Sequence, residues 1–204
     1  VHTLQLIDVA TGWSERAATL GRGQAAMEMG FRRILARLPF PLVHLHPDNG
    51  SEFFNDHLVR FFGTEVTGLT LSRSRPYQKN DNRFVEQKND SLVRAYFGHQ
   101  RLDTPAQCDA LNALYGEMGV YYNLFQPVLH LIEKEVIAGK LKRRWDDAQT
   151  PYQRLAATDT LTPTVAQGLA ALHTGTNPRW LRQQMYDALA QLWERPMIPA
   201  LAAD

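Results

Sequence analysis

The stretch HLHPDNGSEF, residues 44–53, decides the fold class. It overlaps the short apolar run Leu42 to His46, which predicts a buried strand. Asp48 therefore follows the carboxyl end of a strand, where open α/β sheets build their binding sites. The Asn-Gly pair after it permits a sharp turn, and Ser51 suits the N-cap of a following helix. The competing explanation is that Asp48 has no role beyond the strand-to-helix turn, where aspartate is a favoured residue.

The patterns on both sides of this stretch predict a mixed sheet with helices packed against it. Residues Leu4 to Val9 have the composition of a strand buried on both faces, and 13–20 is expected to pair with it as a more exposed strand. Thr104 and Pro105 are typical of a helix start. In chain order we expect strands over 4–9, 13–20, 42–46 and 69–71, and helices over 24–38, 51–62, 83–97 and 105–125.

The second half of the chain predicts a change of organisation after the last of these helices. Residues 1–138 form the expected α/β core, and 139–151 is rich enough in Lys and Arg to predict a basic linker. The helical spacing of 163–193 predicts a small helical extension. We therefore expect two parts, a core over 1–138 and a linker with C-terminal helices over 139–204.

The composition is that of an ordinary globular protein, with 44% hydrophobic and 21% charged residues among 204. The formal net charge of +1 argues against a uniformly basic DNA-coating protein, so a nucleic-acid site must be a local concentration of charge. The single cysteine, Cys108, excludes an intrachain disulfide and a multi-cysteine zinc site. The chain has neither a signal-peptide pattern nor an apolar run near the roughly 20 residues that span a bilayer, so we expect a cytoplasmic protein.

A second informative stretch is SRSRPYQKNDNRFVEQKN, residues 72–89. A basic loop with an aromatic residue runs directly into a helix that carries Glu86 beside the core-facing Val85. Phosphate contacts favour Arg and Lys, and a tyrosine can stack on a sugar or base. A solvated surface loop is the alternative interpretation. The candidate DNA-binding residues are Arg73, Arg75, Tyr77, Lys79 and Lys88.

Together the two stretches resemble the second and third acids of the DDE recombinases, the retroviral integrases and bacterial insertion-sequence transposases. Asp48 and Glu86 are 38 positions apart (86 minus 48). LIDVATGW (6–13) resembles the second strand of that family, and YNLFQPV followed by TPYQRL (122–128 and 150–155) resembles the stretch after its catalytic core. The resemblance implies a ribonuclease-H-like fold and Asp48 and Glu86 as catalytic ligands of two Mg²⁺ or Mn²⁺ ions. It also implies homo-oligomers that cleave and join DNA at mobile-element ends, within the bacterial nucleoid.

The resemblance further implies a first acid on a strand before residue 1, so we expect a core that lacks its first active-site strand. Asp8 is not assigned that role, although it is expected near the site. Two alternatives therefore stay open: an inactive DNA-binding or assembly module with the same fold, and a ribonuclease-H-like hydrolase of RNA–DNA hybrids. The motif around Glu86 favours a recombinase over the hydrolase.

Two further groups of residues are candidates from the residues alone. His44 and His46 occupy alternate positions and would share one face of a strand, as metal ligands or, as we expect, as strand filling. Glu133, Lys134 and Glu135 are expected to form a solvated charge run. The densest basic patch either holds the DNA backbone or is a solvated linker. It consists of Lys140, Lys142, Arg143 and Arg144.

Overall fold

The computed structural model describes residues 1–47, 56–72, 88–98, 100–137 and 140–194. Its first element is an antiparallel hairpin of β1 (His2–Ile7) and β2 (Ser14–Thr19), as the sequence predicts. The Asp8 N–H donates to the Trp13 carbonyl at 2.7 Å and closes the turn. Gly12 in this turn has a φ of +79°, in the left-handed region that favours glycine.

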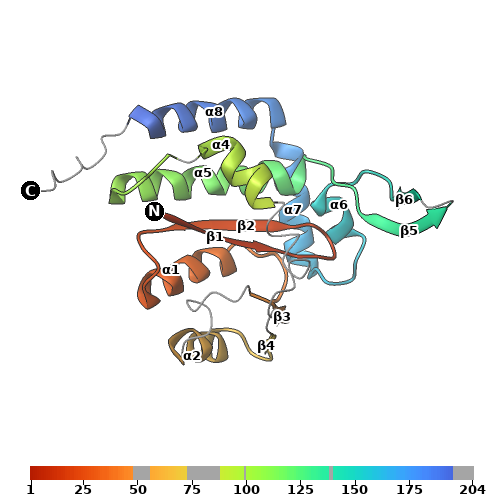
Figure 1. Ribbon diagram of the computed structural model, residues 1–204, viewed down its shortest axis with the longest axis horizontal. Coiled ribbons are helices and arrows are strands. Elements are labelled where there is room, and N and C mark those ends of the chain that lie inside the picture. Colours follow the sequence, from red (N-terminus) through yellow and green to blue (C-terminus); the bar gives the residue numbers. More distant parts are fainter. Residues whose placement is uncertain (48–55, 73–87, 99, 138–139, 195–204) are drawn as a thin grey trace, which may run out of the picture.

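The prediction that the second strand is the more exposed one is wrong, since all six residues of β2 are buried. Helix α1 (Gln24–Leu35) packs on one face of the hairpin and α5 (Pro105–Leu124) on the other (Figure 1). Gly30 permits the close approach of α1, because a Cβ atom there would lie 2.5 Å from Leu4 Cδ1. The hairpin is therefore the middle layer of the fold.

Two asparagines of α5 close the outer edge of β2. The Asn123 amide accepts from the Ser14 N–H at 2.9 Å and donates to the Ser14 carbonyl at 3.1 Å. Asn112 makes the same pair of bonds with Ala18, at 2.9 and 3.0 Å. The two asparagines are 11 positions apart (123 minus 112), close to three helical turns, so both lie on the face of α5 that meets the strand.

A second, shorter sheet lies below α1. Strands β3 (His44–Leu45) and β4 (Thr70–Leu71) pair in parallel, and α2 (Asp56–Glu65) lies between them in the chain. The rings of Phe31 and Phe62 meet edge to face, 4.8 Å between centroids, and join α2 to α1. Both strands and the helix are predicted by the sequence, and together with the hairpin they confirm that the fold mixes α and β elements. The predicted single mixed sheet is not present among the described residues, whose strands form three separate two-stranded sheets.

The helices of the C-terminal half pack mainly around α5. Its N-terminus has the capping box of Thr104 and Gln107, which confirms the predicted helix start. The π-helical turn η2 (Asp90–Arg94), α4 (Ala95–Phe97) and α8 (Pro178–Glu194) share one core with it. This core contains Leu92, Phe97, Leu111, Leu114, Tyr115, Met118, Leu181, Met185 and Leu192. The expected C-terminal extension is therefore helical, and its last helix lies directly against α5 (Figure 1).

Residues 140–145, which the sequence assigned to a basic linker, form a strand instead. β5 (Leu131–Ile137) and β6 (Lys140–Trp145) make an antiparallel hairpin that projects from the helical body (Figure 1). Helices α6 (Pro151–Ala156) and α7 (Pro163–Gly175) follow it. No helix in the described ranges has the length and apolar character needed to cross a membrane.

Candidate nucleic-acid interface

Most of the predicted site residues lie outside the residues that the structure describes. These are Asp48, Glu86, Arg73, Arg75, Tyr77 and Lys79. Lys88 is described, and it is helical like the residues that follow it up to Phe97. Its side chain lines a cavity of about 710 Å³ at the turn end of β1. The candidate site is therefore built from what surrounds Lys88.

Three separate parts of the chain form this cavity. The first is the turn end of the β1–β2 hairpin, the second is Lys88, and the third is the β5–β6 hairpin with the loop that leads into it. The lining residues are Ile7, Asp8, Val9, Gly12, Lys88, 127–131, Lys134, Arg143 and Trp145. The motif LIDVATGW thus supplies one wall and the segment after YNLFQPV supplies another.

The charged side chains around the cavity are mainly cations. Lys134 and Arg143 are direct cross-strand partners in the β5–β6 hairpin, where like charges destabilise the pairing unless an anion lies nearby. Among the described residues, no carboxylate lies within ion-pair distance of Lys88, Lys134 or Arg143. Burial, and next the charge of Arg16, lower the pKa of Lys88. All three cations would be stabilised by an anionic ligand.

Trp145 adds an aromatic surface to the same wall. It follows Arg143 on the same face of β6, and its side chain is 49% exposed. Exposed Trp and Arg next to each other suit a ligand that offers both flat rings and phosphates. This combination is typical of a nucleic-acid surface.

Asp8 is the carboxylate of the cavity wall, and its hydrogen bonds are local. Its Oδ2 accepts from the Thr11 N–H at 2.8 Å and from the Thr11 hydroxyl at 2.5 Å. In the described part of the chain, no three His, Cys, Asp or Glu side chains are grouped as a metal site would require. The described lining therefore fits a phosphate group and does not by itself fit Mg²⁺ or Mn²⁺, which take oxygen ligands.

The base of the β5–β6 hairpin is fixed by Arg154 of the TPYQRL motif. Arg154 donates to Asp146 Oδ2 at 2.5 Å and to the Val128 carbonyl at 3.0 Å. Asp146 Oδ1 accepts from the His130 N–H at 2.6 Å. The hydrogen bond from Arg154 lowers the pKa of Asp146, so the carboxylate stays charged. The two motifs that flank the hairpin in the sequence thus meet at its base and orient Lys134 and Arg143.

His44 and His46 share one side of β3, as predicted, but they are not strand filling. Both are exposed, and the His44 Nε2 and His46 Nδ1 atoms each lie 2.6 Å from the Ser72 hydroxyl oxygen. They are exposed because the parallel β3–β4 pair is only two residues long on each strand, and His46 already lies beyond its end. The two imidazoles connect β3 to the residue that follows β4.

Arg16 is a residue that the sequence analysis missed. It is fully buried, with its guanidinium carbon 6.0 and 5.9 Å from the ring centroids of Tyr115 and Tyr122. Its Nε and Nη1 atoms have no hydrogen-bond partner in the part of the chain that the structure describes. Burial lowers the pKa of Arg16. The charge of Arg16 also lowers the pKa of Lys88, so the two cations are close enough to repel each other. The sequence SERAAT contains no signal for this burial.

Comparison with known proteins adds one relative and no family. No protein-family model matches the chain. An uncharacterized protein of Sinorhizobium fredii, y4rM, is 36% identical over 154 residues, which is 76% of this chain. The chain spans 43% of the length of that relative. Because y4rM is itself uncharacterized, the similarity assigns no activity.

Proposed function

We propose that this protein binds DNA at the cationic cavity and belongs to a recombinase that cleaves and joins phosphodiesters at mobile-element ends in bacteria. The observation that carries the proposal is the convergence of Lys88, Lys134 and Arg143 on one cavity beside Trp145. Lys88 comes from the motif that resembles the DDE recombinases. The other two cations come from a hairpin outside the motifs that carry the resemblance, so they are a separate observation in favour of DNA binding.

The order of the described elements along the chain supports a ribonuclease-H-like fold for this recombinase. The β1–β2 hairpin, α1 and the parallel β3–β4 pair follow one another in the order that the resemblance implies. The peptide groups of Thr3, Gln5 and Ile7 point away from β2 and make no backbone hydrogen bonds with other described residues. The side-chain amide of Gln5 is also buried, without a hydrogen-bond partner among the described residues. In the proposed fold, a further strand pairs with this edge.

Catalysis in this proposal depends on Asp48 and Glu86, both outside the described residues. As in the resemblance, their carboxylates would hold Mg²⁺ or Mn²⁺, which stabilise charge on the attacking and leaving oxygens. The described residues have a different role: Lys88, Lys134 and Arg143 hold the DNA backbone, and Trp145 contacts its sugars or bases. We further propose that the protein assembles as a homo-oligomer on DNA.

A second candidate function is a DNA-binding or assembly module without chemistry. The described cavity wall is compatible with it, because its cations and Trp145 serve DNA binding and its carboxylate, Asp8, is hydrogen-bonded within the turn. Nicking of supercoiled plasmid with Mg²⁺ or Mn²⁺ separates the two functions. The assay uses a protein that also carries the first acid that the resemblance implies. The recombinase then requires nicking that Glu86→Gln abolishes, while the module requires DNA binding with no nicking by either protein.

The salt dependence of DNA binding tests the proposed interface. Fluorescence anisotropy with labelled duplex DNA from 50 to 200 mM salt gives the slope of log K against log salt, which changes by about 0.9 for each phosphate contact. We expect the double variant Lys134→Ala, Arg143→Ala to lower the slope by about 2. The control is Lys140→Ala, Lys142→Ala on the opposite face of the hairpin, with a smaller change. Equal slopes for the wild type and the first variant would place the DNA elsewhere.

A further inference from the structure

The two faces of the β5–β6 hairpin differ in charge. Successive residues of a strand point to opposite faces, so the register of the hairpin assigns each side chain to one of them. On the first face acids lie opposite bases, and Glu133 forms an ion pair with Arg144 at 3.1 Å. Opposite charges in cross-strand positions stabilise a hairpin, so the first face neutralises most of its own charge. It consists of Glu133, Glu135, Ile137, Lys140, Lys142 and Arg144.

No acid of β5 or β6 lies on the second face of the hairpin. This face carries Lys134, Val136, Leu141, Arg143 and Trp145. Val136 and Leu141 are direct cross-strand partners and are 72% and 49% exposed. Adjacent exposed apolar side chains with a polar rim are typical of an interaction surface. The second face therefore offers cations and apolar side chains to the same partner.

The order of these side chains along the hairpin favours DNA as the partner. The inner part of the second face lines the cationic cavity, and Val136 and Leu141 continue this face outward. The hairpin projects from the body of the molecule, so the second face is accessible beyond the cavity (Figure 1). A two-stranded ribbon fits a groove of DNA, and proteins that bend DNA insert leucine or similar side chains between base pairs. The neighbouring cations then lie within reach of phosphates.

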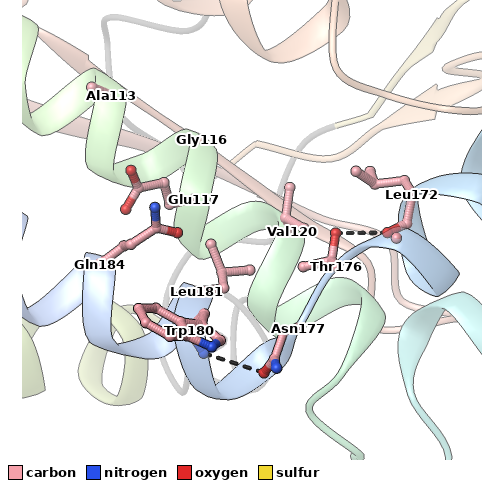
Figure 2. Close-up of a pocket in the computed structure, with 11 residues that line it drawn as sticks. Ala113, Gly116, Glu117, Val120, Leu172, Thr176, Asn177, Trp180, Leu181 and Gln184 are labelled. Carbon is pink, nitrogen blue, oxygen red and sulfur yellow. Dashed lines mark hydrogen bonds between the residues drawn. The ribbon is translucent and has the colours of Figure 1, made fainter.

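A groove elsewhere in the molecule lacks the charge for DNA. It lies between α5, the end of α7 and the first turns of α8, and has a volume of about 570 Å³ (Figure 2). Its lining includes the exposed Trp180 but contains no Lys or Arg, and its one ionisable side chain is the carboxylate of Glu117. Both places thus offer an exposed tryptophan, but of the two only the hairpin face suits phosphates.

We propose that the second face of the hairpin lies in the minor groove of duplex DNA, where Leu141 and Val136 form a wedge that opens a base step and bends the duplex. Lys134 and Arg143 hold the phosphates beside the kink. Opening a base step costs free energy, which the additional contacts of the bent duplex with the protein offset. This inference rests on the proposed function, because it adds bending to the proposed DNA interface.

Resonance energy transfer between dyes on the two ends of a duplex of about 30 base pairs measures the bend. Binding of the wild type should raise the transfer, because a kink of roughly 20–90° brings the ends closer together. We expect the double variant Val136→Thr, Leu141→Thr to bind the duplex but to lose most of this rise. Threonine removes the wedge and keeps the β propensity of the strands. Ile137→Thr is the matched control and keeps the full rise, since Ile137 is 45% exposed on the first face.

Three results would overturn the inference: bound wild type without a rise in transfer, a full rise in the double variant, or an equal loss in Ile137→Thr while both variants are folded by circular dichroism. Fluorescence anisotropy of the same complexes separates this inference from the proposed function. Binding without bending would contradict the wedge and leave the DNA interface standing, whereas no binding would contradict the interface itself. Light scattering tests a second copy as the partner: a dimer that the double variant dissociates, with DNA bending unchanged, would assign the second face to protein.

Discussion

The replacement Asn123→Leu tests whether α5 acts as the missing neighbour of β2. The Asn123 amide pairs with both backbone groups of Ser14, at 2.9 and 3.1 Å, and Ser14 is only 1% exposed. Leucine has a similar branched shape but leaves these two groups buried without partners, at roughly 1–3 kcal/mol each. Burial of the larger apolar side chain returns about 1–2 kcal/mol. We expect the free energy of unfolding to fall by about 2–4 kcal/mol.

Urea unfolding followed by circular dichroism measures this loss. The control is Gln183→Leu on the exposed side of α8, where the amide donates to Asp187 at 2.9 Å and the expected change is within about 0.5 kcal/mol. Asn112→Leu should resemble Asn123→Leu, since Asn112 makes the same pair of bonds with Ala18. A loss below about 1 kcal/mol for Asn123→Leu would show that α5 does not complete the sheet edge.

Two other residues give predictions about pH and local stability. The pKa of Lys88 in the folded protein lies below its ordinary 10.5. At pH values between the folded and the unfolded pKa, the unfolded chain binds more protons than the folded one, so the free energy of unfolding rises with pH. Lys88→Met should therefore be more stable than the wild type at pH 7, and the difference in stability should narrow toward pH 10.5. It should also bind DNA more weakly. A variant that is less stable than the wild type at pH 7 would contradict this. For Arg154→Leu we expect faster amide hydrogen exchange over residues 128–146, because the base of the β5–β6 hairpin loses three hydrogen bonds. The pKa of Asp146 is depressed in the folded protein, so the stability that its carboxylate contributes is lost as pH falls through 3.8 and below. Arg154→Leu should reduce this loss of stability at acid pH. Unchanged hydrogen exchange in Arg154→Leu would show that Arg154 does not anchor the hairpin.

The elements that the sequence predicts are those with a strong local pattern. The helices α1 and α5 follow from apolar spacing and from the Thr104 cap, and β1 follows from its run of aliphatic residues. The burial of β2 could not be predicted, because SERAAT contains no large apolar residue and is buried by two helices that come later in the chain. The asparagines of α5 are likewise polar residues whose role depends on a strand that lies 94 and 109 positions earlier in the chain.

The candidate site was only partly predictable for the same reason. Lys88 follows from the motif that contains Glu86, but Lys134 and Arg143 belong to charge-rich stretches that predict solvated surface or linker. Exposed strands bury few side chains, so their hydrophobic pattern is weak. Only folding brings residues 8, 88, 134 and 143 to one cavity.

Site-specific photo-cross-linking tests the DNA interface most directly. The photoreactive residue p-benzoylphenylalanine replaces Trp145, on the wall of the cationic cavity, or Trp180, in the groove beside α8; both tryptophans are exposed in the structure. Each protein is irradiated with labelled duplex DNA and the covalent complex is quantified on a denaturing gel. We predict efficient cross-linking from position 145 and little from position 180. Equal or greater cross-linking from position 180 would contradict the assignment of the cavity as the DNA site.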